Sequence, residues 1–160
     1  MNEIDRERGR SPHRRAPSSF VLVGLQLGAI AAACWPVGLT NRGHPAWLVL
    51  CALGAVFGLW ALAHNRIGVS GVFPEPRPGM PLITTGPYAL VRHPMYGSLV
   101  VMMAGIAGYN GHLINWVAAL IIVPVVVAKT LVEERLLQRI FPEYRDYLAA
   151  TKRRFLPYLI

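Results

Sequence analysis

The chain has 160 residues, of which 54% are hydrophobic and only 15% are charged, and its mean hydropathy is +0.40. Soluble domains carry about 25% charged residues, so this composition excludes an ordinary soluble domain and indicates an all-α integral membrane protein. The net charge of +8 comes with no recognisable nucleic-acid-binding motif. We therefore expect the basic residues to meet anionic lipids, and we expect no nucleic acid partner.

The first half of the chain predicts a tail and two spanning helices. Residues 1–18 are rich in Arg, Ser and Pro, which predicts a disordered basic tail ahead of a single domain over residues 19–160. The first span is expected from Phe20 to about Val37, and the second from about Ala46 to Ala63. The first apolar run also resembles a secretory signal, but the further apolar runs that follow it favour an uncleaved helix.

The second half predicts two more spans and a polar tail. The third span is expected from Pro94 to about Gly108, and the fourth from about His112 to Val132. From Glu133 onward, apolar residues recur at helical spacing among charged ones, which predicts an amphipathic helical tail at the interface, divided by Pro142. The expected fold is thus four transmembrane helices plus a C-terminal amphipathic tail.

The placement of charge predicts the topology. Lys and Arg gather before the first span, in the long connection His64–Arg92, and after the fourth span. The positive-inside rule then places both termini and that connection in the cytoplasm, with the helices in the cell inner membrane or its equivalent. Cys34 and Cys51 fall inside apolar runs, so neither a disulfide framework nor a metal site is predicted.

The start of the third span carries the first group of candidate site residues. Pro94 suits the first position of a helix, which fixes His93 just outside a helix N-terminus. Free N–H groups and the helix dipole favour an anion at that place. Arg92 adds a permanent positive charge, and Tyr88 and Tyr96 supply hydroxyls or aromatic faces.

The end of the fourth span carries the second group, the adjacent acids Glu133 and Glu134. They should lie at the same face as His93, because the third and fourth spans form an antiparallel hairpin. Negative charge is unfavourable at a helix C-terminus, so the pair needs a positive partner: a ligand ammonium, Arg92 or Arg135. Solvated surface acids are the plain alternative. Convergence on His93 would suit a zwitterionic ligand such as an amino-acid moiety.

Two sequence blocks carry a family resemblance. Gly86-Pro87-Tyr88, followed by Arg92-His93-Pro94-Met95-Tyr96-Gly97, resembles the signature of the isoprenylcysteine carboxyl methyltransferase and phospholipid methyltransferase superfamily. The C-terminal pattern of that superfamily resembles the acid pair with the residues that follow it: Leu137, Phe141, Tyr144, Tyr147 and Arg154-Phe155-Leu156-Pro157. The resemblance covers about residues 65–160, with Pro142 where the family has Gly.

The resemblance implies a membrane methyltransferase that binds S-adenosylmethionine at the cytoplasmic ends of the last helices. It also implies a lipophilic small-molecule substrate that enters from the bilayer. By similarity, His93, Tyr96 and either Glu133 or Glu134 hold the cofactor. The sulfonium would rest against Tyr88 or Tyr96 by cation–π attraction.

The acceptor is the open question. A carboxylate needs a cation to orient it, and Arg92 and Arg154 are the candidate catalytic residues, which favours O-methylation of a prenylcysteine-like carboxylate. An ethanolamine phospholipid needs its ammonium deprotonated, with His93 or a glutamate as the base. Two other functions remain as alternatives, an NADPH-dependent membrane reductase with the same helical core and a non-catalytic membrane scaffold.

Overall fold

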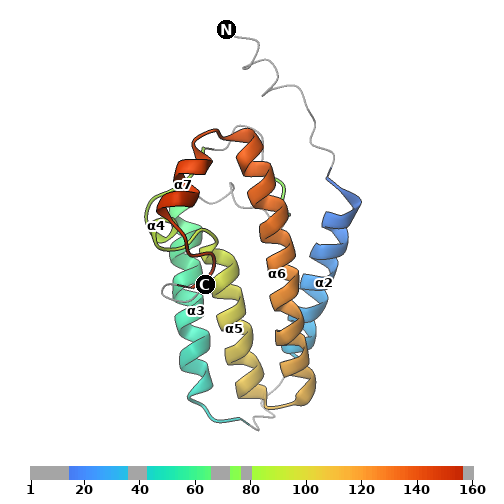
Figure 1. Cartoon of the computed structure of the whole chain (residues 1–160). Helices are drawn as coiled ribbons and strands as arrows, with labels where there is room; N and C mark the ends of the chain where they lie inside the picture. Colours follow the sequence, from blue (N-terminus) through green and yellow to red (C-terminus); the bar gives the residue numbers. More distant parts are fainter. Residues whose placement is uncertain (1–14, 36–42, 66–72, 77–80, 157–160) are drawn as a thin grey trace.

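The computed structural model of the chain describes residues 15–35, 43–65, 73–76 and 81–156. Within these residues all regular structure is helical, which confirms the all-α fold class. Four long helices lie side by side, and two short ones lie near one end of them (Figure 1). The helices are α2 (Pro17–Ala33), α3 (Trp47–His64), α4 (Pro87–Leu90), α5 (Pro94–Asn110), α6 (Leu113–Ile140) and α7 (Tyr144–Ala150).

Two of these helices, α3 and α6, are long and apolar enough to cross a membrane by length and composition. Helix α2 is apolar but has 17 residues, and α5 also has 17. Large apolar side chains of α2, α3 and α6 are exposed on the outside of the bundle, among them Leu25, Leu59 and Leu120. An apolar surface of this kind suits contact with lipid, and α3 and α6 are two candidate membrane spans within the described residues.

The helix boundaries differ from the prediction at α2. This helix begins at Pro17, so residues 17 and 18, predicted to lie in the disordered tail, are helical, while residues 1–14 lie outside the described part of the chain. It ends at Ala33, earlier than expected. Asn115 of α6 donates from Nδ2 to the carbonyl oxygen of Ala33 at 2.9 Å. This bond satisfies a backbone acceptor that the helix end leaves unpaired.

The helices pack in the order α3, α5, α6, α2 across the bundle (Figure 1). Helices α3 and α5 approach closely because glycines face the contact: a Cβ added at Gly105 would lie 2.6 Å from the backbone nitrogen of Cys51. Small residues of this kind let the backbones of membrane helices come together. The third and fourth predicted spans, α5 and α6, form the expected hairpin.

Helix α6 corrects one premise of the prediction. It continues unbroken past Glu133 to Ile140, whereas the amphipathic tail was expected to begin at Glu133. The last turns stay helical because Leu137 is buried in a cluster with aromatic residues of the following segment. The acid pair therefore lies inside a helix and not at its C-terminus, and the predicted repulsion by the helix dipole does not arise.

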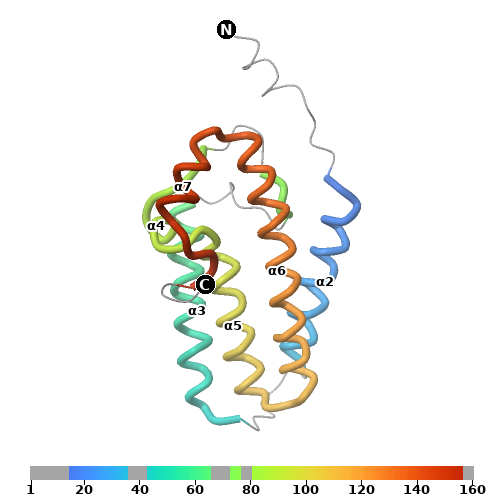
Figure 2. The backbone as a smooth tube through the Cα atoms, viewed as in Figure 1, coloured from blue at the N-terminus to red at the C-terminus, as the bar shows by residue number. Residues whose placement is uncertain are grey.

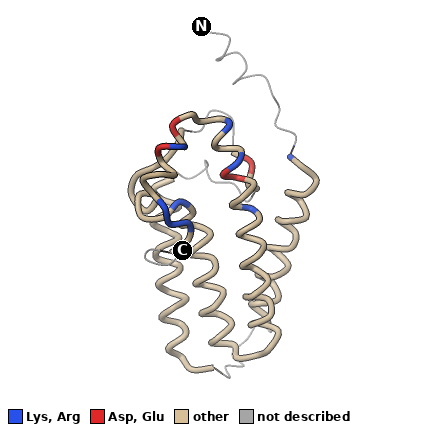
Figure 3. Tube along the Cα trace, in the orientation of Figure 1, with Lys and Arg blue, Asp and Glu red and all other residues tan. Residues whose placement is uncertain are grey.

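The chain turns back after α6. Phe141 and Pro142 separate α6 from α7, so the predicted division at Pro142 is confirmed. Helix α7 and the segment after it then return toward α4 and the start of α5 (Figure 2). In the described residues, Lys, Arg, Asp and Glu gather at this same end of the bundle, and the opposite end carries none (Figure 3). The polar groups thus lie on one side of an apolar bundle.

Candidate functional site

The start of α5 is shaped by its own sequence. Pro94 is the first residue of the helix and His93 is its N-cap, as predicted from the His-Pro pair. The proline fixes φ and lacks an N–H, so it begins a helix without losing a hydrogen bond. His93 is 4% exposed, and its imidazole stacks on the ring of Tyr96 with the centroids 5.7 Å apart. Both side chains are therefore held in place at the helix end.

The C-terminal segment is paired with the residues before α5. The backbone N–H groups of Arg92 and His93 donate to the carbonyl oxygens of Arg153 and Arg154, at 2.9 and 2.8 Å. Gly97 makes room for this segment, since a Cβ there would lie 2.0 Å from the carbonyl oxygen of the residue after Arg154. The pairing brings together two parts of the chain that lie far apart in the sequence. Arg92 and Lys152, for example, are 60 positions apart and share a hydrogen bond.

Glu134 is the centre of a charged network that joins three segments of the chain. Its Oε1 accepts a hydrogen bond from Nε of Arg92 at 2.9 Å, and Nε2 of His93 lies 3.3 Å from the same oxygen. Its Oε2 accepts from Nη2 of Arg154 at 3.2 Å. The Glu134 and Arg92 side chains are 7% and 8% exposed. Buried charge-assisted bonds of this kind fix geometry strongly.

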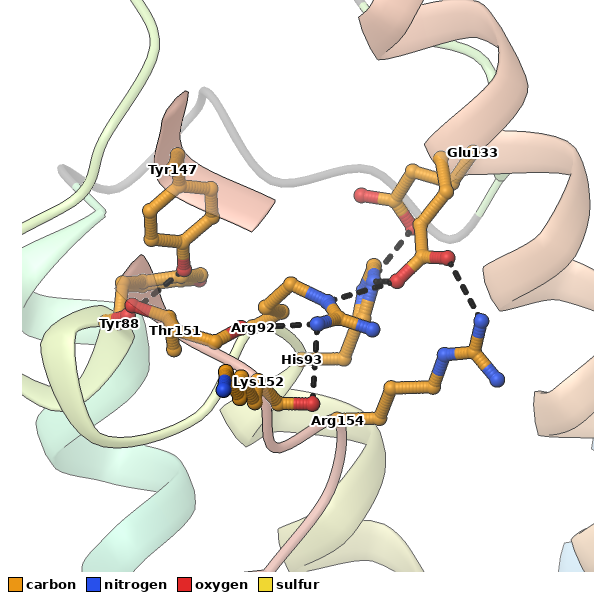
Figure 4. Close-up of polar contacts among 9 residues, drawn as sticks. Tyr88, Arg92, His93, Glu133, Tyr147, Thr151, Lys152 and Arg154 are labelled. Atoms are coloured by element: carbon orange, nitrogen blue, oxygen red, sulfur yellow. Dashed lines mark hydrogen bonds and ion pairs between the residues drawn. The ribbon is translucent and has the colours of Figure 1, made fainter. Parts of the chain in front are cut away.

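Arg92 also anchors the C-terminal segment. Its Nη1 donates to the carbonyl oxygens of Thr151 and Lys152, at 2.8 and 3.0 Å (Figure 4). The guanidinium thus has protein acceptors on two of its three nitrogens. The predicted catalytic contact of Arg92 and of Arg154 with an acceptor stays a prediction, and both side chains have a structural task at Glu134.

Glu133 faces a different environment from its neighbour. Its side chain is 28% exposed, and its Oε2 lies 3.8 Å from Nδ1 of His93. It lines a cavity between the end of α6, the start of α5 and the connection that precedes α4. Glu134 is bonded to two arginines and His93, whereas Glu133 accepts a hydrogen bond from the Tyr96 hydroxyl and lines the cavity. The two adjacent acids therefore differ in their partners, and Glu133 is the one at the cavity.

The cavity brings together most of the predicted site residues. Five of the seven line it: Tyr88, Arg92, His93, Tyr96 and Glu133. The other two, Glu134 and Arg154, lie outside its lining; Glu134 contacts the side chains of Arg92 and His93, and the carbonyl of Arg154 accepts from the His93 N–H. The cavity wall also contains residues of α7 and of the described part of the long connection, among them Phe73, Leu82 and Ile83.

Helix α7 closes the cavity with two tyrosines. Tyr144 and Tyr147 both line it, with their ring centroids 5.6 Å apart. The hydroxyl of Tyr147 donates to the backbone carbonyl of Tyr88 at 2.6 Å (Figure 4). Burial raises the pKa of both the Tyr144 and the Tyr147 phenol, so both remain protonated donors at neutral pH.

Two residues near the cavity were missed at the level of sequence. Glu75 lines the cavity from the long connection, where it is a lone acid among prolines that no periodic pattern singles out. Lys129 is fully buried, donates to Gln26 of α2, and lies 5.5 Å from the ring centroid of Tyr96. Lys129 stands four positions before Glu133, on the same helix face, and that spacing was a usable signal.

Comparison with known proteins identifies the family. Residues 43–144, well over half of the chain, match the family described as phospholipid methyltransferase. The comparison with curated proteins finds no match. The family match contains the cavity-lining residues from Asn65 to Tyr144 and ends before Arg154. The chain belongs to the phospholipid methyltransferase family, which confirms the resemblance drawn from its two sequence blocks.

Proposed function

We propose that the protein is an S-adenosylmethionine-dependent methyltransferase that acts on a lipophilic membrane substrate. Membership of the family supports methyl transfer in a membrane. The observation that carries the proposal is the cavity at the polar end of the bundle, where His93, Tyr96 and Glu133 meet from two helices. A site at this place can meet a water-soluble cofactor on one side and a lipid on the other.

The residues present fit the cofactor. S-adenosylmethionine carries an amino-acid carboxylate and ammonium, a sulfonium and an adenine ring. The carboxylate of Glu133 suits the ammonium, and the start of α5 beside His93 suits the cofactor's carboxylate. The aromatic faces of Tyr88 and Tyr96 suit the sulfonium or the adenine. Glu134 contributes to binding by holding Arg92 and His93 in position.

The chain's own residues provide alignment and exclusion of water. When bound, the cofactor supplies an electrophilic methyl group for an in-line displacement, which needs positioning more than acid–base power. Tyr144 and Tyr147 close the cavity on the side of α7, and Leu137 adds apolar wall. The network at Glu134 holds the start of α5, and with it His93, in one geometry.

The contacts of Arg92 and Arg154 change which of the two candidate acceptors, a carboxylate or an amine, is favoured. The sequence favoured a prenylcysteine-like carboxylate gripped by Arg92 and Arg154. Both arginines donate to Glu134, so a carboxylate acceptor would have to compete with that residue. The cavity is also lined by two acids, Glu75 and Glu133. These contacts favour an amine, such as an ethanolamine phospholipid, with the carboxylate as the second candidate.

We propose that the protein lies in the cell inner membrane or its equivalent. In the proposed topology four helices span the membrane, and both termini face the cytoplasm. The gathering of charge at one end of the bundle supports a single cytoplasmic face that meets anionic lipids. Helices α2 and α5, with 17 residues each, measure about 26 Å at 1.5 Å per residue. That is slightly short of a hydrocarbon core of about 30 Å, which a bilayer can accommodate by thinning.

Cofactor binding tests the proposal against its alternatives. Purified protein in lipid nanodiscs is titrated separately with S-adenosylmethionine and with NADPH. Binding of S-adenosylmethionine alone is the expected result. Binding of NADPH alone would indicate a membrane reductase, and binding of neither would indicate a non-catalytic scaffold.

A pH–rate profile then separates the two acceptors. Activity on an amine lipid should rise with pH as the amine loses its proton, whereas activity on a prenylcysteine acid should need no group that titrates near neutral pH. With a carboxylate acceptor, Arg92→Lys should impair turnover more than cofactor affinity, because lysine lacks the planar fork that grips a carboxylate. Activity on the prenylated acid alone would reverse the order proposed here.

A further inference from the structure

Glu75 holds the start of helix α2 with one of its two carboxylate oxygens. Its Oε1 accepts a hydrogen bond from the backbone N–H of Ala16 at 3.2 Å and another from the hydroxyl of Ser19. Ala16 is the N-cap of α2 and Ser19 lies in its first turn. An acceptor with negative charge at this place satisfies free donors and suits the helix dipole.

The other oxygen of the same carboxylate has no such partner. Oε2 is buried, and no donor in the described part of the chain reaches it. Glu75 also lines the cavity that contains His93, Tyr96 and Glu133. A buried carboxylate oxygen without a donor is unfavourable. A molecule in the cavity can supply the missing donor.

The surroundings indicate which donor fits. A second carboxylate, Glu133, lines the same cavity, together with the aromatic rings of Phe73, Tyr88 and Tyr96. Two carboxylates and several aromatic faces attract a cation that donates hydrogen bonds. The chain's own cations nearby have other partners: Arg92 donates to Glu134 and to two backbone carbonyls, and Lys129, whose charge also acts on both acids, donates to Gln26. Arg15 lies over the ring of Phe73. An ammonium group of a bound molecule matches this environment.

We propose that Glu75 is a binding residue for an ammonium group in this cavity, and that its Oε2 accepts the hydrogen bond. The inference rests on the proposed function and names a residue that the family pattern did not supply. Two sources offer the same chemistry. One is the amino-acid ammonium of S-adenosylmethionine, and the other is the amine of a lipid acceptor.

The test uses Glu75→Gln, which keeps the side-chain length and an acceptor for α2 but removes the charge and places an amide at the carboxylate. Ser19→Ala is the matched control, because it removes a donor only on the α2 side of Glu75. Three ligands are titrated on the full-length protein in nanodiscs. S-adenosylmethionine and S-adenosylhomocysteine both carry the ammonium, and 5′-methylthioadenosine lacks it.

If the cofactor's ammonium binds Glu75, Glu75→Gln should weaken S-adenosylmethionine and S-adenosylhomocysteine by about tenfold or more, and it should leave 5′-methylthioadenosine unchanged. If the acceptor's amine binds there, all three affinities should stay at the parent values. Direct binding of a fluorescent phosphatidylethanolamine, with S-adenosylhomocysteine present, should then weaken relative to phosphatidylglycerol.

Unchanged binding of every ligand to Glu75→Gln would overturn the inference, and so would equal losses in Ser19→Ala, which would show a role in α2 alone. If Glu75→Gln does not fold, Glu75→Asp is used instead. Aspartate keeps the negative charge, but its shorter side chain moves the carboxylate away from the ligand, so binding of the same ligands should weaken, to a smaller degree. A parent protein that binds neither S-adenosylmethionine nor lipid amine would overturn the proposed function itself. A parent that binds them while the variants match it would overturn only the role of Glu75.

Discussion

Glu133 and Glu134 are adjacent in sequence, but their surroundings predict opposite consequences when each is replaced. Glu134 accepts hydrogen bonds from Arg92 and Arg154, and the Glu134–Arg92 pair is almost fully buried. Removing one partner of a buried ion pair costs about 3–5 kcal/mol, because the other charge is left without compensation. Arg154 is 38% exposed, so water screens its pair and it adds little. Glu134→Ala should therefore lower the free energy of unfolding by about 3–5 kcal/mol.

Glu133 should behave in the reverse way. It faces the cavity, and its contact with His93 is long at 3.8 Å. Glutamine also keeps an acceptor for the Tyr96 hydroxyl that Glu133 binds, so Glu133→Gln should unfold close to the parent. Losing a carboxylate that meets a charged ligand group costs about 1.5–3 kcal/mol of binding free energy, which is roughly tenfold or more in cofactor affinity.

The assay measures both quantities on the same samples. Thermal unfolding of the parent, Glu133→Gln and Glu134→Ala is recorded in one nanodisc composition, and S-adenosylmethionine affinity is determined below the unfolding transition. Glu134→Gln is the control that keeps an acceptor while removing the charge, and it should lose less stability than the alanine variant. Parent-like unfolding of Glu134→Ala, or a destabilised Glu133→Gln with unchanged affinity, would refute this division of roles.

Gly97→Ala should destabilise the protein by about 1–3 kcal/mol, because the added Cβ would overlap a backbone carbonyl of the C-terminal segment. The control Gly24→Ala should be neutral or stabilising, because no atom lies within 4 Å of its added Cβ. Unfolding measurements on the two variants and the parent test this. His93→Ala should weaken S-adenosylmethionine by about 1.5–3 kcal/mol in a binding titration, and an unchanged affinity would make the histidine structural. In a background without the natural cysteines, Ala46→Cys should react with an impermeant thiol reagent from outside and Ala89→Cys only from inside, and the reverse labelling would overturn the topology.

The sequence predicted the part of the site that depends on helix ends. The His93-Pro94 pair marked the start of α5, since proline at a first helical position has a local steric cause. A hairpin of two apolar runs then placed His93 and the acid pair at the same end of the bundle. These conclusions need only the lengths of the runs and the local chemistry of proline, so they could be made without a structure.

The rest depended on three-dimensional packing. Whether Glu133 or Glu134 faces the cavity depends on the rotation of α6 about its axis, and adjacent helix positions differ by about 100°. The change from apolar to charged residues at Glu133 favours a helix end, but a helix needs only its own backbone bonds to continue, and α6 runs on to Ile140. The role of Glu75 depends on where a long connection folds, and a lone acid among prolines carries no periodic signal.

We propose that the cavity beside His93 and Glu133 delivers a methyl group from S-adenosylmethionine to a membrane lipid. The most direct measurement incubates the purified parent protein and Glu133→Gln, in vesicles of a total lipid extract, with methyl-labelled S-adenosylmethionine and follows the label in the lipid fraction. We expect label in lipid with the parent and far less with Glu133→Gln at equal amounts of folded protein. A folded parent that transfers no label to any lipid, or equal incorporation by the two proteins, would contradict the claim.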